Sequence, residues 1–158
     1  MTSRESSPVR KEEKKEEQQQ DVTEEKSIDE LIDMSTFDQL LEMDDEDDHE
    51  FSQGIVVNYF DQANETFKDM DRALKKEDLS ELSRLGHFLK GSSAAIGLKK
   101  VQASCEKIQN YGNRKGEDDT LTEEEALKRI ADLLPQVKKE YSEAEEYLKK
   151  FYEIQDPL

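Results

Sequence analysis

Apolar residues recur every three or four positions along most of this chain, which is the period of an α-helix rather than of a β-strand. The longest series, near the C-terminus, keeps this spacing for about seven helical turns. It consists of Leu127, Ile130, Leu134, Val137, Tyr141, Ala144, Leu148 and Phe151. No segment shows the strict alternation of apolar and polar residues that a half-buried strand requires. We therefore expect an all-α protein, folded as an antiparallel four-helix bundle.

Pairs of a polar residue and an acidic residue three positions later predict where helices begin, because such pairs satisfy the free N–H groups of a first turn. The pairs are Ser27 with Glu30, Ser35 with Asp38, Asp78 with Glu81, and Thr122 with Glu125. The first pair opens a short extra helix at the N-terminal end of the bundle. Gly97 predicts the end of one helix, and Pro135 predicts a kink or a lost hydrogen bond in the last one.

The same spacing predicts which residues are buried in the remaining helices. After Ser35 these residues are Phe37, Leu40, Leu41 and Met43. The next helix is long and is expected to bury Phe51, Ile55, Tyr59, Ala63, Phe67, Met70 and Leu74. The two helices before the final one are expected to bury Leu79, Leu82, Leu85, Leu89 and Ile96, and then Leu98, Val101, Cys105, Ile108 and Gly112.

Composition limits the class of protein and its partners. Residues 1–26 hold charged and glutamine side chains with almost nothing to bury, so we expect a disordered tail before a domain over residues 27–158. The chain has 40 acidic and 23 basic residues, a formal net charge of -17, which argues against nucleic acid or an anionic membrane surface as a partner. Because the chain has one cysteine, it has no internal disulfide, and the sequence shows no recognisable signal peptide or membrane span. We expect a soluble, intracellular protein.

The acidic run from Asp44 to Asp48, followed by His49 and Glu50, is the first place to consider a metal. An EF-hand loop needs alternating ligands, a glycine at its sixth position and a glutamate at its twelfth, whereas this run has consecutive acids and no glycine. We therefore interpret it as a solvated loop whose carboxylates favour the N-terminus of the following helix, with His49 exposed. No metal site is expected.

Several classes of catalytic motif are missing from the sequence. The chain has neither of the glycine-rich loops that cradle nucleotide phosphates. Its two histidines are isolated, and its cysteine, Cys105, is expected to be a buried structural thiol. The sequence therefore shows no pairing of a nucleophile with a general base of the kind that hydrolases use.

One helix carries the candidate chemistry, a histidine followed by a lysine and a glycine. If its leucines face the core, His87, Lys90 and Gly91 share the adjoining exposed stripe, because they lie three and four positions apart. A glycine there costs about 1 kcal/mol relative to alanine, and small residues at Gly86 and at 91–95 are expected to clear the surface around the imidazole. An exposed imidazole is partly neutral at cytosolic pH, so its nitrogen can accept a phosphoryl group whose charge the lysine offsets.

The string HFLKGSSAAIGLKKV, followed by CEKIQNYG, resembles the histidine-containing phosphotransfer (HPt) domain, in particular the fungal, yeast-type HPt intermediate of the osmosensing multistep phosphorelay. The family's H-x-x-K-G-S/T-S/A run is present without gaps. The resemblance covers residues 28–112, and the last helix matches in type and position only. One departure is that the yeast-type pattern places a base directly after the glycine matching Gly112, whereas here Asn113 precedes Arg114.

The resemblance implies a role for each residue of the motif. His87 is the phosphorylated residue, Lys90 neighbours the phosphoryl group, and Gly91 leaves room for a receiver domain. Gln109 is implied to hydrogen-bond and orient the histidine, and Ser92 matches the small hydroxyl residue of the motif. Receiver docking is implied to use an apolar patch drawn from Leu40, Met43, Phe51, Ile55 and Phe88.

These roles imply a phosphorelay intermediate that accepts a phosphoryl group from a receiver aspartate onto His87 and passes it to a second receiver. The implied partners are the receiver domain of a hybrid sensor histidine kinase and those of response regulators, which would supply Mg²⁺; this chain needs no cofactor and no ATP of its own. We expect a monomer, because the patch is reserved for receivers, and a cytoplasmic and nuclear location. The competing interpretation is a non-catalytic acidic helical-bundle adaptor, and a third is an HPt-like pseudo-domain, against which the intact His87 argues.

Overall fold

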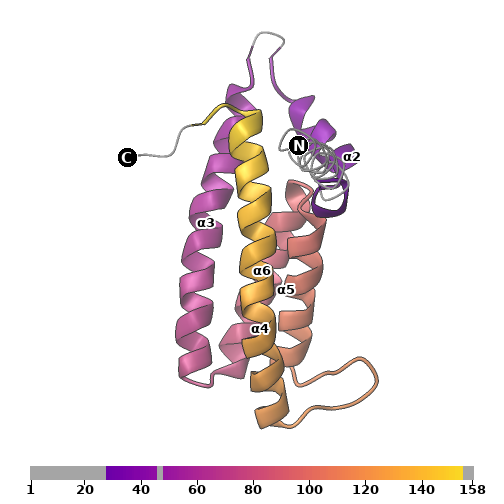
Figure 1. Cartoon of the computed structure of the whole chain (residues 1–158), viewed down its shortest axis with the longest axis vertical. Coiled ribbons are helices and arrows are strands. Elements are labelled where there is room, and N and C mark those ends of the chain that lie inside the picture. The colour runs from indigo at the N-terminus through magenta and orange to yellow at the C-terminus, as the bar shows by residue number, and fades with distance from the viewer. Residues whose placement is uncertain (1–27, 46–47, 155–158) are drawn as a thin grey trace, which may run out of the picture.

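A computed structural model of the chain describes residues 28–45 and 48–154. Neighbouring helices of the bundle run antiparallel (Figure 1); they are α3 (Glu50–Lys75), α4 (Leu79–Ala95), α5 (Lys99–Gly112) and α6 (Glu123–Phe151). A helical turn over residues 28–31 and helix α2 (Met34–Leu41) lie at the end of the bundle where α3 begins. The predicted four-helix bundle with a short extra helix is thus confirmed. The expected disorder of residues 1–26 and the helix start at Ser27 fall outside the described residues.

Three of the predicted helix boundaries are confirmed, two by capping hydrogen bonds and one by a backbone angle. The Asp78 carboxylate accepts the backbone N–H of Glu81 at 3.1 Å and begins α4. A capping box between Thr122 and Glu125 begins α6, with both reciprocal bonds present. Gly97 follows the end of α4 with φ +87°, in the left-handed region that a glycine enters without steric cost.

Helix α2 begins earlier than the sequence signals predict. Its N-cap is Asp33, whose carboxylate accepts the N–H of Ser35 at 3.1 Å, so Ser35 lies inside the first turn instead of capping it. The backbone N–H of Asp33 donates to the carbonyl of Gly97 at 2.7 Å. This contact with a segment distant in sequence fixes the position of Asp33, and no local pattern reveals it.

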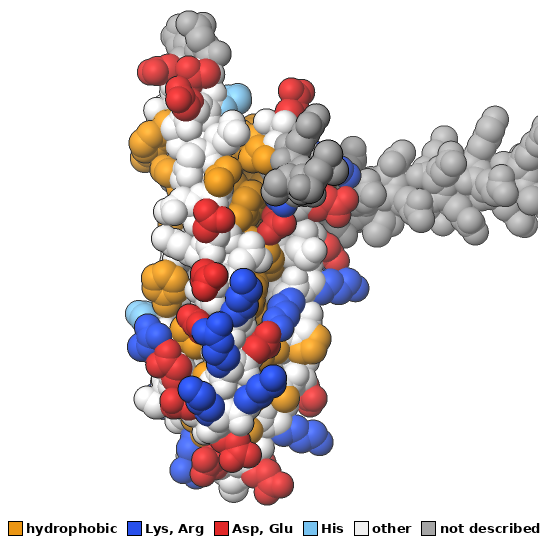
Figure 2. Space-filling view, turned by 90° about the vertical axis from the view of Figure 1, so that its left-hand side faces the viewer, with side chains coloured by type: hydrophobic (Ala, Val, Ile, Leu, Met, Phe, Trp, Pro, Cys, Tyr) orange, Lys and Arg blue, Asp and Glu red, His pale blue; other side chains and the backbone are white. Residues whose placement is uncertain are grey.

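Charged side chains cover the outer faces of the bundle. On the face that carries α3, hydrophobic side chains gather in the upper half and Lys and Arg side chains in the lower half (Figure 2). Arg72 pairs with Asp69 within α3, and Lys138 of α6 reaches Asp71 of α3 at 2.8 Å. Because these pairs are solvent-exposed, each contributes only about 0–1 kcal/mol, and the fold must be stabilised mainly by its core.

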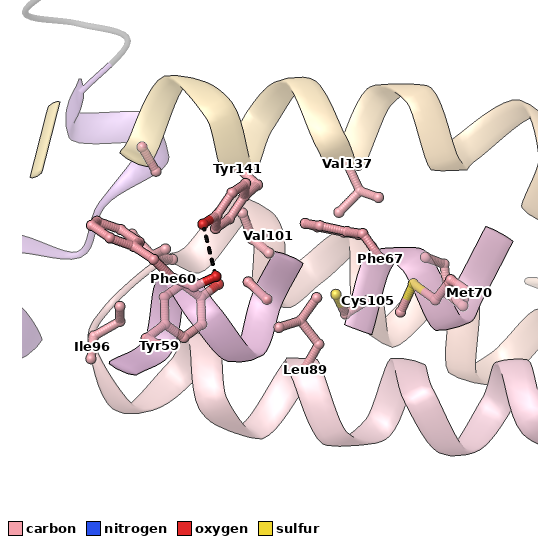
Figure 3. Close-up of a cluster of buried hydrophobic side chains, with 14 of the residues drawn as sticks. Tyr59, Phe60, Phe67, Met70, Leu89, Ile96, Val101, Cys105, Val137 and Tyr141 are labelled. Carbon is pink, nitrogen blue, oxygen red and sulfur yellow. Dashed lines mark hydrogen bonds between the residues drawn. The ribbon is translucent and has the colours of Figure 1, made fainter. Parts of the chain in front are cut away.

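The core is one continuous cluster of apolar side chains between the long helices. Tyr59 and Phe67 of α3, Leu89 of α4, Cys105 of α5 and Tyr141 of α6 all point into it (Figure 3). The seam predicted for α5 is buried in full. That of α6 is buried except at its ends, where Leu127 is half-buried and Phe151 is 38% exposed. Helix α6 continues through Pro135, whose exposed position leaves the missing N–H on the solvent side.

The seam predicted for α3 is wrong in its first two turns. Phe51 is 52% exposed and Ile55 is half-buried, whereas Ser52 and Val56 are fully buried. Two adjacent stripes of this helix carry apolar residues, and the spacing alone favours the stripe with Phe51. The structure buries the neighbouring stripe instead, and the buried hydroxyl of Ser52 is satisfied there by a hydrogen bond to Asp44.

Candidate functional site

His87 lies in the middle of α4, on its solvent-exposed side. Leu85 and Leu89, two positions to either side, are buried in the core and fix the rotation of the helix. Within the described part of the chain, neither ring nitrogen of His87 takes part in a hydrogen bond or an ion pair. The imidazole therefore has a free nitrogen that an incoming group can reach.

Lys90 and Gly91 follow His87 by three and four positions, so all three lie on one face of α4. Lys90 is half-buried, and its ammonium group makes no ion pair among the described residues. Gly91 is exposed, and a Cβ atom built on it would meet nothing within 4 Å. Because Gly91 has no side chain, the surface beside the imidazole is open, as the sequence predicts.

The other small residues of α4 do not all clear that surface, which corrects the sequence interpretation. A Cβ atom on Gly86 would lie 2.9 Å from the carbonyl oxygen of Cys105 and 2.9 Å from the backbone nitrogen of Gln109, so this glycine lets α4 and α5 approach closely. Ser93 is fully buried, and its hydroxyl bonds that of Tyr59 at 2.7 Å. Gly86 and Ser93 are packing residues.

Gln109 does not make the hydrogen bond to the imidazole that the resemblance implies, and Ser92 bonds within its own helix. The Gln109 side-chain oxygen is buried and has no hydrogen-bond partner among residues 28–45 and 48–154, so no bond joins it to His87. The Ser92 hydroxyl donates to the backbone carbonyl of Phe88 at 3.3 Å, within its own helix. A buried acceptor without a donor is costly, and Gln109 thus keeps an unused hydrogen-bonding capacity one helix away from the exposed histidine.

Three of the five residues expected to form the apolar patch are exposed. Met43, Phe51 and Phe88 expose 66%, 52% and 45% of their surface, and Ile55 is half-buried. Met43 was also expected on the buried side of its helix, which is wrong, because α2 ends at Leu41 and Met43 follows it in the connection. Leu40 is buried in the core with 8% exposed, so the patch must be drawn without it.

The α5–α6 connection shows how the chain accommodates its departure from the yeast-type pattern. Gly112 packs against α4, since a Cβ atom there would lie 2.7 Å from the backbone nitrogen of Ser83. The Ser83 hydroxyl donates to the Asn113 side-chain oxygen at 3.0 Å, and the Arg114 Nε donates to the carbonyl of Leu121 at 2.9 Å. Asn113 therefore bonds α4, and Arg114 stays within its own connection.

Metal binding, a reactive thiol and a membrane span are the other features to consider in the described residues. Residues 28–45 and 48–154 contain no group of three or more His, Cys, Asp or Glu side chains placed to hold a metal ion. Burial raises the pKa of the Cys105 thiol to about 12, with a smaller contribution from Glu140, so the thiol is protonated and unreactive. In the part of the chain described, no helix is both long and apolar enough to cross a membrane.

Asp44 is the one functional candidate that the sequence interpretation missed. We expected a solvated carboxylate, but its side chain is only 3% exposed and is bonded to Ser52 and His49. The capping role expected of the acidic run holds for Asp44, which accepts the N–H of Ser52, and for Asp48, which accepts that of Glu50. The burial of Ser52, which only the structure shows, is what requires a nearby acceptor, so no sequence signal identified Asp44.

Comparison with known proteins places this site in a family. The Hpt domain model matches residues 54–147. Multistep phosphorelay regulator 1 of Schizosaccharomyces pombe is 54% identical over 127 residues, which cover 78% of this chain and 43% of that protein. Phosphorelay intermediate protein YPD1 of Saccharomyces cerevisiae is 48% identical over 86 residues, 54% of this chain and 51% of that protein. The chain thus spans about half the length of these relatives.

The fold gives the same result as the sequence comparison. The co-crystal structure of Saccharomyces cerevisiae Ypd1 with the receiver domain of its downstream response regulator Ssk1 matches with a TM-score of 0.69 and 34% identity. The match covers 78% of this chain and 95% of that Ypd1 chain. The sequence and the structure of the bundle that carries His87, Lys90 and Gly91 both match Hpt proteins. The chain therefore belongs to the family of Hpt domains.

Proposed function

We propose that this chain is a phosphorelay intermediate, which accepts a phosphoryl group from a receiver-domain aspartate onto His87 and passes it to the aspartate of a second receiver. The observation that carries the proposal is the exposed His87, whose ring nitrogens make no bond to the residues that the structure describes, with Lys90 and Gly91 on the same face of α4. The related YPD1 is named a phosphorelay intermediate protein, and Ypd1 was crystallised with a receiver domain.

The transfer needs only one nucleophilic atom from this chain. The lone pair of a neutral ring nitrogen forms the N–P bond, while the P–O bond to the receiver aspartate breaks and its electron pair leaves with the carboxylate. The second transfer reverses these steps toward another aspartate. Phosphoryl transfer depends on positioning and on charge neutralisation, and we propose that the receiver supplies the Mg²⁺ and the acidic pocket.

The neighbours of His87 contribute charge and space. The ammonium group of Lys90, one turn away, offsets the negative charge that the imidazole gains on phosphorylation. Gly91 lets the receiver backbone approach closely, because no side chain stands between it and the imidazole. The buried side-chain oxygen of Gln109 has no partner among the described residues, and the Ser92 hydroxyl bonds only the Phe88 carbonyl among them; we propose that these two side chains position the phosphorylated ring.

The exposed apolar side chains Met43, Phe51 and Phe88, with the half-buried Ile55, form the proposed receiver docking surface. Apolar contacts suit transient binding of partners to an acidic protein, because they are insensitive to its charge. We propose as partners the receiver of a hybrid sensor histidine kinase and those of response regulators. We also propose that the chain acts as a monomer in the cytoplasm and nucleus, where both kinds of receiver can be reached.

Radiolabelled phosphate tests the proposal directly. The full chain is mixed with a phosphorylated receiver, and acid-labile, alkali-stable label on the chain is measured. We expect label on the wild type and none on His87→Gln, with unchanged helicity, since an exposed imidazole contributes little to packing.

The matched control replaces the other histidine. His49→Gln should still take up phosphate from phosphoramidate, a small donor that needs no docking. Absence of label from the wild type would favour the non-catalytic adaptor, and label on His87→Gln would move the acceptor to another residue.

A further inference from the structure

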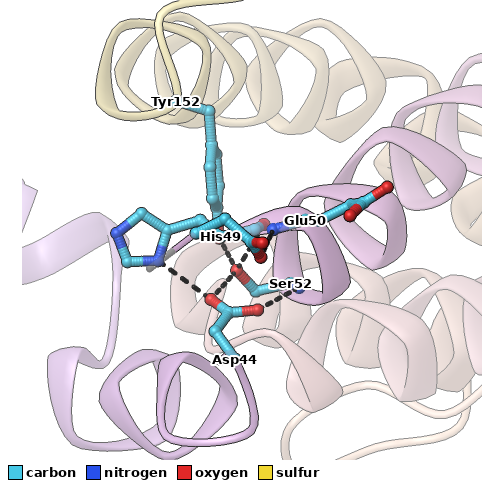
Figure 4. A network of polar contacts seen from close by, with 6 residues as sticks. Asp44, His49, Glu50, Ser52 and Tyr152 are labelled. Carbon is cyan, nitrogen blue, oxygen red and sulfur yellow. Dashed lines mark hydrogen bonds and ion pairs between the residues drawn. The ribbon is translucent and has the colours of Figure 1, made fainter. Parts of the chain in front are cut away.

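A buried carboxylate links the two ends of the α2–α3 connection. Asp44, three residues after α2, accepts the backbone N–H of Ser52 at 2.7 Å and the Ser52 hydroxyl at 2.6 Å (Figure 4). The ring Nδ1–H of His49 donates to the same carboxylate at 3.0 Å. Three donors therefore converge on one side chain, and the N–H among them belongs to the first turn of α3.

The residue that follows α6, Tyr152, also bonds to this network. The hydroxyl of Tyr152 donates to the Ser52 hydroxyl oxygen at 2.8 Å, across 100 residues of sequence. The centroid of its ring lies 6.2 Å from that of the His49 ring. The centroid of the neighbouring Phe151 ring lies 5.2 Å from that of Phe37 in α2. Helix α2, the start of α3 and the end of α6 thus meet at Asp44.

Asp44 and Ser52, the two residues that these bonds join, each follow an exposed apolar side chain. Met43 precedes Asp44 and Phe51 precedes Ser52, and these two are the most exposed large hydrophobic residues of the described chain. An open hollow of about 410 Å³ is lined by Met43 and Phe51 together with Asp45, Asp48 and Glu50. The Asp44–Ser52 bonds therefore join the two segments of the chain that carry Met43 and Phe51.

We propose that Asp44 is a positioning residue for receiver docking, which holds Met43 and Phe51 at a fixed separation through its bonds to Ser52. The proposal rests on the proposed function, because it assumes that receivers dock on this edge. A surface already held in its binding geometry loses less conformational freedom when a partner binds, so the affinity depends on Asp44. The chemistry at His87 does not, since no bond connects Asp44 to α4.

Receiver-dependent transfer separates docking from chemistry. Initial rates are measured with the full chain over a range of phosphorylated receiver concentrations, well below the melting temperature. For Asp44→Ala we expect the half-saturating receiver concentration to rise about tenfold, while the rate of His87 phosphorylation by phosphoramidate stays within about twofold. Asp44→Asn keeps an acceptor oxygen for the Ser52 N–H and should recover part of the affinity.

Two further variants keep the result interpretable. Asp38→Asn removes one negative charge from an exposed carboxylate of α2 and should leave the half-saturating concentration unchanged. Tyr152→Phe removes only the outer hydrogen bond, so it is expected to fold and to raise that concentration two- to threefold, roughly the loss of one weak bond. It provides the test if Asp44→Ala does not fold.

The proposal is overturned if neither Asp44→Ala nor Tyr152→Phe changes the half-saturating concentration, or if Asp38→Asn changes it as much as Asp44→Ala does. It is also overturned if phosphoramidate labelling falls in parallel with receiver-dependent transfer, since Asp44 would then act on the whole fold. Failure of the proposed function looks different, because the wild type itself would then take no phosphate from the receiver.

Discussion

The backbone of Gly86 faces the backbone nitrogen of Gln109 so closely that a Cβ atom at position 86 would lie 2.9 Å from it. Five residues further along the same helix, a Cβ atom on Gly91 would meet nothing within 4 Å. The two glycines of α4 therefore have opposite roles, one inside the bundle and one on its surface.

Gly86→Ala should destabilise the protein by about 1–3 kcal/mol, because the added methyl group meets backbone atoms of α5 that cannot turn aside. Chemical denaturation of wild type and variant measures the change in the free energy of unfolding. An unchanged free energy would mean that α4 and α5 separate without cost at this point.

Gly91→Gln should keep or raise the melting temperature, with a gain of up to about 1 kcal/mol, since glycine is the poorer helix former and its surroundings are open. The same variant should lose most receiver-dependent transfer, because displacing reacting atoms by about 1 Å can cost a hundredfold in rate. Phosphoramidate labelling of His87 should suffer much less. Unaffected transfer from the receiver would remove the proposed role of the open surface.

Lys90→Ala should slow transfer, or shorten the lifetime of the phosphohistidine, without preventing either. The ammonium group makes no ion pair among the described residues, so its loss should leave the melting temperature nearly unchanged. Single-turnover transfer and the decay of purified phosphoprotein measure the two effects. If both match the wild type, Lys90 has no part in the reaction.

Cys105 should resist thiol reagents in the folded protein. Burial raises its pKa to about 12, so neither access nor thiolate is available near neutral pH. Labelling should be complete in denaturant and slow without it. Gly86→Ala should accelerate labelling of the native protein, because it disturbs the helix contact that contains the Cys105 carbonyl. Rapid labelling of the native wild type would contradict the buried position.

The acid sensitivity of the fold should depend on Asp44. Burial by itself raises the pKa of this carboxyl, but hydrogen bonds from the Ser52 side chain and backbone and from His49 bring it below its ordinary value. A carboxyl with a lowered pKa stabilises the fold above its unfolded pKa, and this stabilisation is lost as the pH falls through the folded pKa.

Asp44→Asn should therefore be less stable than the wild type near neutral pH, and the difference should shrink as the pH falls below about 4. Denaturation at a series of pH values measures it. A difference that stays constant with pH would show that the charge of Asp44 is not what stabilises the network.

The sequence by itself determined the helical class, the ends of α4 and the start of α6, and the buried seams of α5 and α6. These features depend on local interactions, because a cap such as Asp78 or Thr122 bonds a residue three positions away and a seam repeats along one helix. The sequence motif also located His87, Lys90 and Gly91 correctly on one exposed face.

The tertiary structure decided everything that depends on which segments meet. It placed Gly86 against Gln109, buried Leu40, and buried Ser52 instead of Phe51 at the start of α3. Among the described residues it left the Gln109 side-chain oxygen without a hydrogen-bond partner. It also joined Asp44 to Ser52 and Tyr152. Contacts between residues far apart in sequence leave no periodic or spacing signal, so only the packed helices reveal which glycine is a contact and which acid is buried.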